Sequence, residues 1–253
     1  MKVIKESPLI KTLERSNADV KFAVLFGSCR RGENNAFSDV DVFVVCGGED
    51  DKSLISNELV QLSLKVEREI HPTLFTLKEF NNRIRHHDYL LASILEDSTF
   101  LLGNMGYFLE GRQLILMGQP DVNSISFNRN MGTKILGYAN YCLNEFRSCW
   151  KRYVRKIEPY DMNRELLLKG LQNYHLALGY LLASKEMKKL NKAMSLRRLL
   201  APQTNSLLKD LISIEKKVRR LKPVNLEVQN VLYRLDSNDL PRRALGHGSA
   251  GNK

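Results

Sequence analysis

The sequence predicts an α+β fold in which a small mixed-sheet domain precedes an all-α helical bundle. Strand-like and helical patterns alternate through the first 120 residues, whereas from about residue 125 only helical spacing remains. The charge changes at the same place: residues 1–120 carry 14 Lys and Arg against 17 Asp and Glu, and residues 121–253 carry 25 against 11. We therefore expect domains over 1–120 and 121–236, followed by a disordered basic tail over 237–253.

The first domain is expected to alternate between helices and strands. Apolar residues at a period of two indicate strands, and apolar residues three and four apart indicate amphipathic helices. The expected strands are 21–26, 39–46, 69–75 and 99–102, and the expected helices are 8–16, 52–67, 77–85 and 88–96. Because Pro72 has no N–H to donate to a neighbouring strand, the third strand should be an edge strand or bulged.

The second half is predicted to be helical throughout. A long helix ends at Glu158-Pro159 and carries an apolar stripe of Ile135, Tyr138, Cys142, Phe146, Cys149, Tyr153 and Ile157. A second helix over 163–190 carries Leu167, Leu171, Tyr174, Leu178 and Leu181, and further helices are expected over 204–221 and 225–235. Such stripes are typical of a bundle that buries one face of each helix.

One motif in the first domain points to chemistry. A strand runs into the turn Gly27-Ser28, and ten residues later the next strand opens with Asp39-Val40-Asp41. Since side chains alternate along a strand, Asp39 and Asp41 point the same way while Val40 points into the core. Two adjacent carboxylates favour a divalent cation as their counter-charge, and backbone N–H groups in a tight turn bind phosphate oxygens. The pattern predicts a metal–triphosphate site.

The motif resembles the nucleotidyltransferase superfamily of the DNA polymerase beta type. Two segments carry the resemblance: Phe26-Gly27-Ser28-Cys29-Arg30-Arg31-Gly32 and Ser38-Asp39-Val40-Asp41-Val42-Phe43-Val44. They look closer still to its minimal and kanamycin-nucleotidyltransferase-like members, over about residues 18–105. The resemblance implies Mg²⁺-dependent transfer of an NMP to an acceptor hydroxyl with release of pyrophosphate. ATP is the default donor, and another NTP stays open.

The resemblance also implies roles for individual residues. Asp39 and Asp41 would hold two Mg²⁺ ions, the Gly27 and Ser28 amides would hold the β- and γ-phosphates, and Arg31 would add a bidentate phosphate contact. A third carboxylate on a later strand usually completes such a site, and Glu69-Ile70-His71-Pro72 occupies its place here. Glu69 is the better metal ligand and His71 the better general base; both share a strand face, and either could point into the cleft. We take Glu69 as the third catalytic residue.

The acceptor is not specified by the sequence. The basic second half favours RNA or another polyanion, while a protein hydroxyl or a small hydroxylated molecule stays open, as does the oligomeric state. The alternative function is a nucleotide- or RNA-binding regulatory, antitoxin-like protein with a catalytically weak nucleotidyltransferase fold. An aminoglycoside-resistance enzyme would need an acidic acceptor pocket, and the basic second half argues against it.

Other features favour ordinary structural roles. No apolar run approaches the ~20 residues that span a bilayer and the first residues lack a secretory signal, so we expect a cytoplasmic protein without a membrane partner. The cysteines are expected to be small buried residues. Arg30 and the junction His86-His87-Asp88 are expected to be solvated. The basic run 151–156 is expected to be the wet face of a helix or a phosphate-binding surface.

Overall fold

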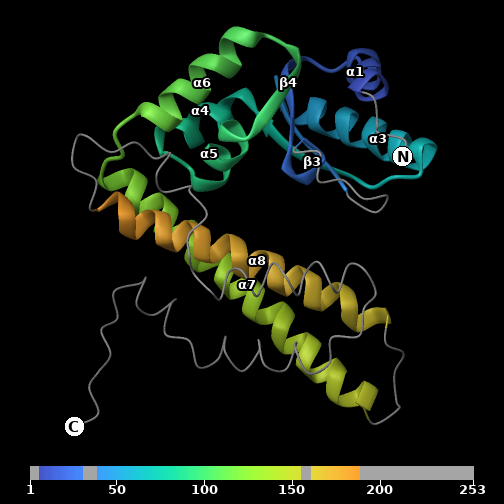
Figure 1. Ribbon diagram of the computed structural model, residues 1–253, viewed down its shortest axis with the longest axis vertical. Coiled ribbons are helices and arrows are strands. Elements are labelled where there is room, and N and C mark those ends of the chain that lie inside the picture. Colours follow the sequence, from blue (N-terminus) through green and yellow to red (C-terminus); the bar gives the residue numbers. More distant parts are fainter. Residues whose placement is uncertain (1–5, 31–38, 155–160, 189–253) are drawn as a thin grey trace. The chain divides into compact units, whose positions relative to one another are not determined.

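The computed structural model describes residues 6–30, 39–154 and 161–188 (Figure 1). These residues fall into two compact units, one ending at Gln119 and the other beginning at Pro120. The first unit contains a four-stranded mixed sheet with helices, and two long helices are described in the second. The predicted α+β fold, a mixed sheet followed by helices, is therefore confirmed.

The sheet belongs wholly to the first unit. Its strands are β1 (Val20–Phe26), β2 (Val40–Cys46), β3 (Ile70–Thr76) and β4 (Ser98–Gly103). They lie in the order β3-β2-β1-β4, with β1 antiparallel to both β2 and β4 and with β2 parallel to β3. β3 is thus an edge strand, as Pro72 predicts.

Helices cover both faces of the sheet. In Figure 1, α1 (Glu6–Arg15) and α3 (Glu49–Val66) lie on one side, and α4 (Leu77–Arg85), α5 (Tyr89–Glu96) and α6 (Met105–Met117) lie on the other. The side of α1 and α3 is aliphatic, with Val42 and Val44 of β2 in one buried cluster with Leu13 and Ile55.

The opposite side of the sheet has an aromatic core. The rings of Phe22 and Phe80 meet edge to face with centroids 5.2 Å apart, and those of Phe43 and Phe75 do the same at 5.2 Å. Because neighbouring residues of a strand face opposite sides, Asp41 shares this side of β2 with Phe43. The second aspartate of the motif therefore continues the aromatic face towards the start of the strand.

Helix α6 was not predicted from the sequence. Phe108 and Ile115 are buried, but the large apolar residues Tyr107, Leu109 and Leu114 are exposed, so the apolar residues do not form one face. Gly111 also lowers the intrinsic preference for helix. Its lack of a side chain is used where α6 contacts α4, because a Cβ there would lie 2.5 Å from the ring of Phe80.

The second unit is described by two helices that lie antiparallel, α7 (Val122–Val154) and α8 (Asp161–Met187) (Figure 1). All five residues of the stripe predicted on α8 are buried. On α7, Tyr138 was predicted to lie on the buried stripe, but it is 49% exposed. Ala139 and Leu143 are buried instead. Leu143 lies against Gly170 of α8, so the contact line follows Ala139 and Leu143 rather than the larger Tyr138.

Several expectations fall outside the described residues. The helices over 204–221 and 225–235, the tail over 237–253 and Arg31 lie there, as do the side chains of the basic run 151–156. Within the described ranges, no helix is both long enough and apolar enough to cross a membrane.

Candidate functional site

The end of β1 and the beginnings of β2 and β3 meet at one end of the sheet. Phe26, the last residue of β1, pairs with Asp41, and Asp41 pairs with His71 across the parallel strands. Asp39 and Glu69 each immediately precede their strand. The pairing of these strands therefore brings together two segments that are about thirty residues apart in sequence, each carrying acidic residues.

Gly27 lets the chain turn directly beside the second aspartate. It opens the four-residue helix α2 (Gly27–Arg30) with a φ of 73°, a left-handed conformation that favours glycine. A Cβ at this position would collide with the Oδ2 atom of Asp41. Glycine is therefore required on two grounds, and it allows the backbone that leads into Ser28 to touch the motif carboxylate.

Three side chains at this end of the sheet bring potential metal ligands together. Asp39, Glu69 and His71 each offer one ligand atom, and these atoms all lie within 4.8 Å of one another. The Nε2 atom of His71 lies 2.7 Å from Oε1 of Glu69, and its Nδ1 atom lies 3.8 Å from Oδ2 of Asp39. The side chain of Asp39 is 12% exposed, whereas those of His71 and Glu69 are 44% and 69% exposed. The cluster is therefore anchored at Asp39 and accessible from solvent at Glu69.

The sequence left Glu69 and His71 open as the third member of the site, and both lie in the cluster with Asp39. Glu69 and His71 lie on the same side as Asp39 and contact each other. Asp41 is the neighbour of His71 in strand register, and its carboxylate lies against the Gly27 turn. We call Asp39, Asp41, Glu69 and His71 the acidic end of the sheet.

Arg30 connects α2 to the opposite edge of the sheet. Its guanidinium forms an ion pair with Asp97, the residue that ends α5 immediately before β4. Arg30 is exposed, as expected of a solvated side chain, and its ion pair with Asp97 lies at the surface. This contact links the turn after β1 to the beginning of β4.

Comparison with known proteins agrees with this geometry. Residues 8–104 match the family described as polymerase beta, nucleotidyltransferase. The first unit is a nucleotidyltransferase domain. The match spans all four strands and ends at the residue after β4, so the acidic end lies inside it.

Two solved structures are also similar to the chain at low identity. A toxin–antitoxin crystal structure with AMP-PNP has 17% identity and a TM-score of 0.36, covering 51% of this chain and 91% of that one. A mutant of the toxin–antitoxin MntA-HpeT has 15% identity and a TM-score of 0.34, with the same coverage of 51% and 91%. No curated protein matches the chain.

The acidic end fits the divalent metal that nucleotidyltransferase domains generally use. Hard divalent cations take carboxylate oxygens, and an imidazole nitrogen suits first-row transition ions. Asp39, Glu69 and His71 supply both kinds of donor atom within the span of one ion's ligands.

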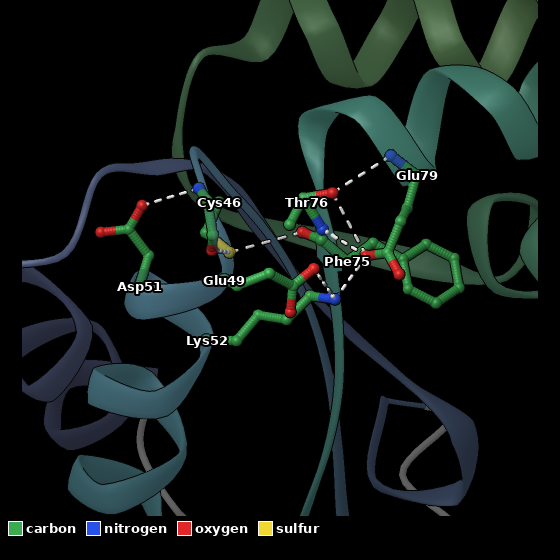
Figure 2. Close-up of polar contacts among 8 residues, drawn as sticks. Cys46, Glu49, Asp51, Lys52, Phe75, Thr76 and Glu79 are labelled. Carbon is green, nitrogen blue, oxygen red and sulfur yellow. Dashed lines mark hydrogen bonds and ion pairs between the residues drawn. The ribbon is translucent and has the colours of Figure 1, made fainter.

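The other end of the β2–β3 pair is also polar, and a lysine lies between two of its carboxylates. Figure 2 shows Lys52 of α3 between Glu49 and Glu79, with Nζ 3.1 Å from Oε1 of Glu49 and 2.5 Å from Oε2 of Glu79. Thr76 and Glu79 form a reciprocal cap at the start of α4: the amide of Glu79 donates to the Thr76 hydroxyl, and the amide of Thr76 donates to the Glu79 carboxylate. We call these four residues the Lys52 cluster.

The pKa values in the Lys52 cluster indicate a structural role. Desolvation alone would lower the pKa of Lys52, but its bonds to Glu79 and Glu49 outweigh it and raise that pKa. Desolvation would raise the pKa of Glu79, yet the bond from Lys52 and the amide of Thr76 hold it below its usual range. Burial, with a smaller contribution from Asp51, raises the pKa of the nearby Cys46 thiol to about 11. Cys46 is therefore a neutral buried residue near neutral pH, as the sequence predicted.

The junction between α4 and α5 was predicted incorrectly. Asp88 is fully buried, accepts a hydrogen bond from the amide of Leu91 at 2.8 Å and pairs with Arg83 at 2.6 Å. His87 is also buried. The junction is thus a capped and charge-paired part of the core instead of a solvated turn. It lies between α4 and α5, whereas the residues of the acidic end lie at the starts of β2 and β3.

Proposed function

We propose that the protein is a Mg²⁺-dependent nucleotidyltransferase that moves AMP from ATP to an acceptor hydroxyl and releases pyrophosphate. One observation carries the proposal: the ligand atoms of Asp39, Glu69 and His71 cluster where the neighbouring Asp41 lies against the Gly27 turn, inside a nucleotidyltransferase domain. Like charges this close together repel, and a cation bound among them would offset that repulsion.

The two motif aspartates are proposed to hold the metal. Asp39 is mostly buried at the start of β2, and Asp41 is fixed by the β-ladder between Phe26 and His71. Rigid strand residues keep their carboxylates in place without the triphosphate, which reduces the cost of ordering the site. The bound cations would neutralise the charge of the triphosphate and of the departing pyrophosphate.

The phosphates are proposed to lie over the Gly27 turn. Backbone N–H groups of Gly27 and Ser28 follow β1 directly and can bind phosphate oxygens. The Ser28 hydroxyl and Arg31, which follow in sequence, would add contacts to the same phosphates. Catalysis would then depend on positioning and charge neutralisation, as in phosphoryl chemistry generally.

The acceptor is proposed to be RNA or another polyanion. Residues 121–253 carry 25 Lys and Arg against 11 Asp and Glu, which favours an anionic partner through phosphate contacts. A protein hydroxyl is the competing acceptor, because the same acidic end would activate any hydroxyl placed beside it.

The proposal can be tested by following two labels. The protein is incubated with Mg²⁺, a cell lysate and ATP labelled at either the α- or the γ-phosphate, and products are then treated with nuclease or protease. We expect the α-label, but not the γ-label, to enter an acceptor that one of the two treatments destroys. Transfer of neither label would contradict the proposal and favour the alternative of a nucleotide- or RNA-binding regulatory protein.

A further inference from the structure

The imidazole of His71 lies between two carboxylates at clearly different distances. Its Nε2 atom is 2.7 Å from Oε1 of Glu69, a normal hydrogen-bond length. Its Nδ1 atom is 3.8 Å from Oδ2 of Asp39, which is too long for a hydrogen bond. The two nitrogens therefore have different roles.

The short contact determines which nitrogen carries the proton. A carboxylate accepts hydrogen bonds, so Nε2 is the donor to Glu69. In a neutral imidazole the other nitrogen then has a lone pair, and this nitrogen, Nδ1, is the one nearer Asp39. A lone pair and a carboxylate oxygen on the same side of the ring are two ligands for a cation.

The longer contact is within the reach of one shared ion. Two donors that each bind one cation at about 2.1 Å can lie no more than about 4.2 Å apart. The separation of 3.8 Å between Nδ1 of His71 and Oδ2 of Asp39 is within this limit. An ion could bind both atoms without movement of either strand.

We propose that His71 Nδ1 and Asp39 bind one divalent cation, and that Glu69 is the positioning residue that orients the imidazole. This inference rests on the proposed function only in requiring a metal at the acidic end. A histidine that binds a metal through one nitrogen commonly donates its other N–H to a carboxylate, which fixes the tautomer and the orientation of the ring. Glu69, 69% exposed and hydrogen-bonded to Nε2, fits this outer position.

The nitrogen ligand also changes which ion the site takes. Mg²⁺ prefers oxygen ligands throughout, whereas imidazole suits first-row transition ions and Mn²⁺ also accepts carboxylates. A site with Asp39 and His71 is therefore expected to take Mn²⁺ as well as the Mg²⁺ of the proposed reaction. The exposed side of His71 and Glu69 gives an ion access from solvent.

The test measures the ligand directly, without any transfer reaction. Full-length protein without a histidine tag is loaded with Mn²⁺ in the absence of nucleotide, and pulsed electron paramagnetic resonance records coupling from a coordinated imidazole nitrogen. We expect this coupling in the wild type and in the control His175→Gln, and its loss in His71→Gln with about a tenfold weaker Mn²⁺ affinity. Glu69→Gln should keep the nitrogen coupling and weaken the affinity about tenfold or more.

Several outcomes would overturn the assignment. They are Mn²⁺ that binds the wild type without nitrogen coupling, coupling that survives in His71→Gln, or no Mn²⁺ binding at all. His71→Asn serves as a second variant if His71→Gln loses its circular dichroism spectrum. Because no nucleotide is present, a failure of the transfer assay leaves this result unaffected, and the two proposals can fail separately.

Discussion

The two ends of the parallel pair β2–β3 carry similar residue types in opposite electrostatic arrangements. At the Lys52 cluster, Lys52 binds the carboxylates of both Glu49 and Glu79, and Thr76 completes the cap of α4. At the acidic end, the carboxylates of Asp39 and Glu69 lie beside the His71 imidazole, and that of Asp41 lies against the Gly27 turn. The first arrangement connects α3, β3 and α4, whereas the second is the proposed cation site.

This difference teaches how to separate structural from functional acidic residues. A carboxylate whose pKa is held low by a lysine and a backbone amide, as in Glu79, stabilises the fold through that pairing. Carboxylates placed beside one another on strand ends repel, and a bound cation would offset that repulsion. The comparison predicts that substitutions at the acidic end reduce transfer more than stability, and that substitutions in the Lys52 cluster do the reverse.

The largest effect is expected from Asp41→Asn. Loss of one charge in the metal site should reduce nucleotide transfer by at least about 10²-fold, because electrostatic stabilisation is lost where charge develops. The melting temperature should stay close to that of the wild type, because asparagine keeps the size of the side chain and an oxygen that accepts hydrogen bonds. Rates of α-label incorporation and thermal melts measure the two effects. A transfer rate of Asp41→Asn close to the wild-type rate would contradict a functional role for the acidic end.

Gly27→Ala should affect both stability and transfer. The positive φ and the collision with Asp41 predict a loss of about 1–3 kcal/mol in the free energy of unfolding, measured in urea. Transfer should fall with it, because the turn and Asp41 must separate.

Gly48→Ala is the matched control for Gly27→Ala, at the opposite end of β2. Gly48 has an extended φ of −143°, and its nearest neighbour to an added Cβ is Asp51 at 3.9 Å. We expect a cost of about 0.5 kcal/mol, from the weaker N-cap, and unchanged transfer. Equal losses of stability and transfer in the two alanine variants would contradict the conclusion that position 27 requires glycine.

Lys52→Met should reduce stability and spare transfer. The substitution keeps the apolar stem and removes the charge that Glu49 and Glu79 share, so we expect a loss of about 1 kcal/mol or less, given their partial exposure. Urea unfolding measures this loss, and the transfer rate should remain within about twofold of wild type. A large loss of transfer with normal stability would assign the Lys52 cluster a functional role.

The smallest effect is a pH dependence that Glu79→Gln should remove. Because the pKa of Glu79 is lower in the folded protein than its ordinary 4.5, its contribution to stability is present above pH 4.5 and is lost as the pH falls through the lowered value. The variant should therefore lose less stability as the pH falls through this acidic range. Urea unfolding at a series of pH values measures the loss. Parallel curves for both proteins would show that the contact with Lys52 does not stabilise the fold.

Local patterns in the sequence predicted most of the first unit. Alternation gave the four strands near their observed bounds, and Pro72 indicated the edge position of β3. The spacing of Gly27 and Asp41 predicted their juxtaposition, because β1, the turn and β2 are consecutive along the chain. These features depend on neighbours in sequence.

Features that depend on distant partners were not predictable in this way. Arg30 pairs with Asp97, and α6 places Gly111 against α4. The choice between Glu69 and His71 depends on the register of β2 and β3, which brings both beside Asp39. The burial of Asp88 did have a local signal, since an aspartate immediately before a helix is a common N-cap.

The central claim is tested most directly by one side-by-side transfer assay with α-labelled ATP, Mg²⁺ and lysate. The assay compares wild type, Asp41→Asn and Lys52→Met. The acidic end is functional and the Lys52 cluster is structural if the label enters an acceptor with wild type and Lys52→Met and is lost with Asp41→Asn. Equal labelling by wild type and Asp41→Asn, or no labelling by wild type, would contradict the account.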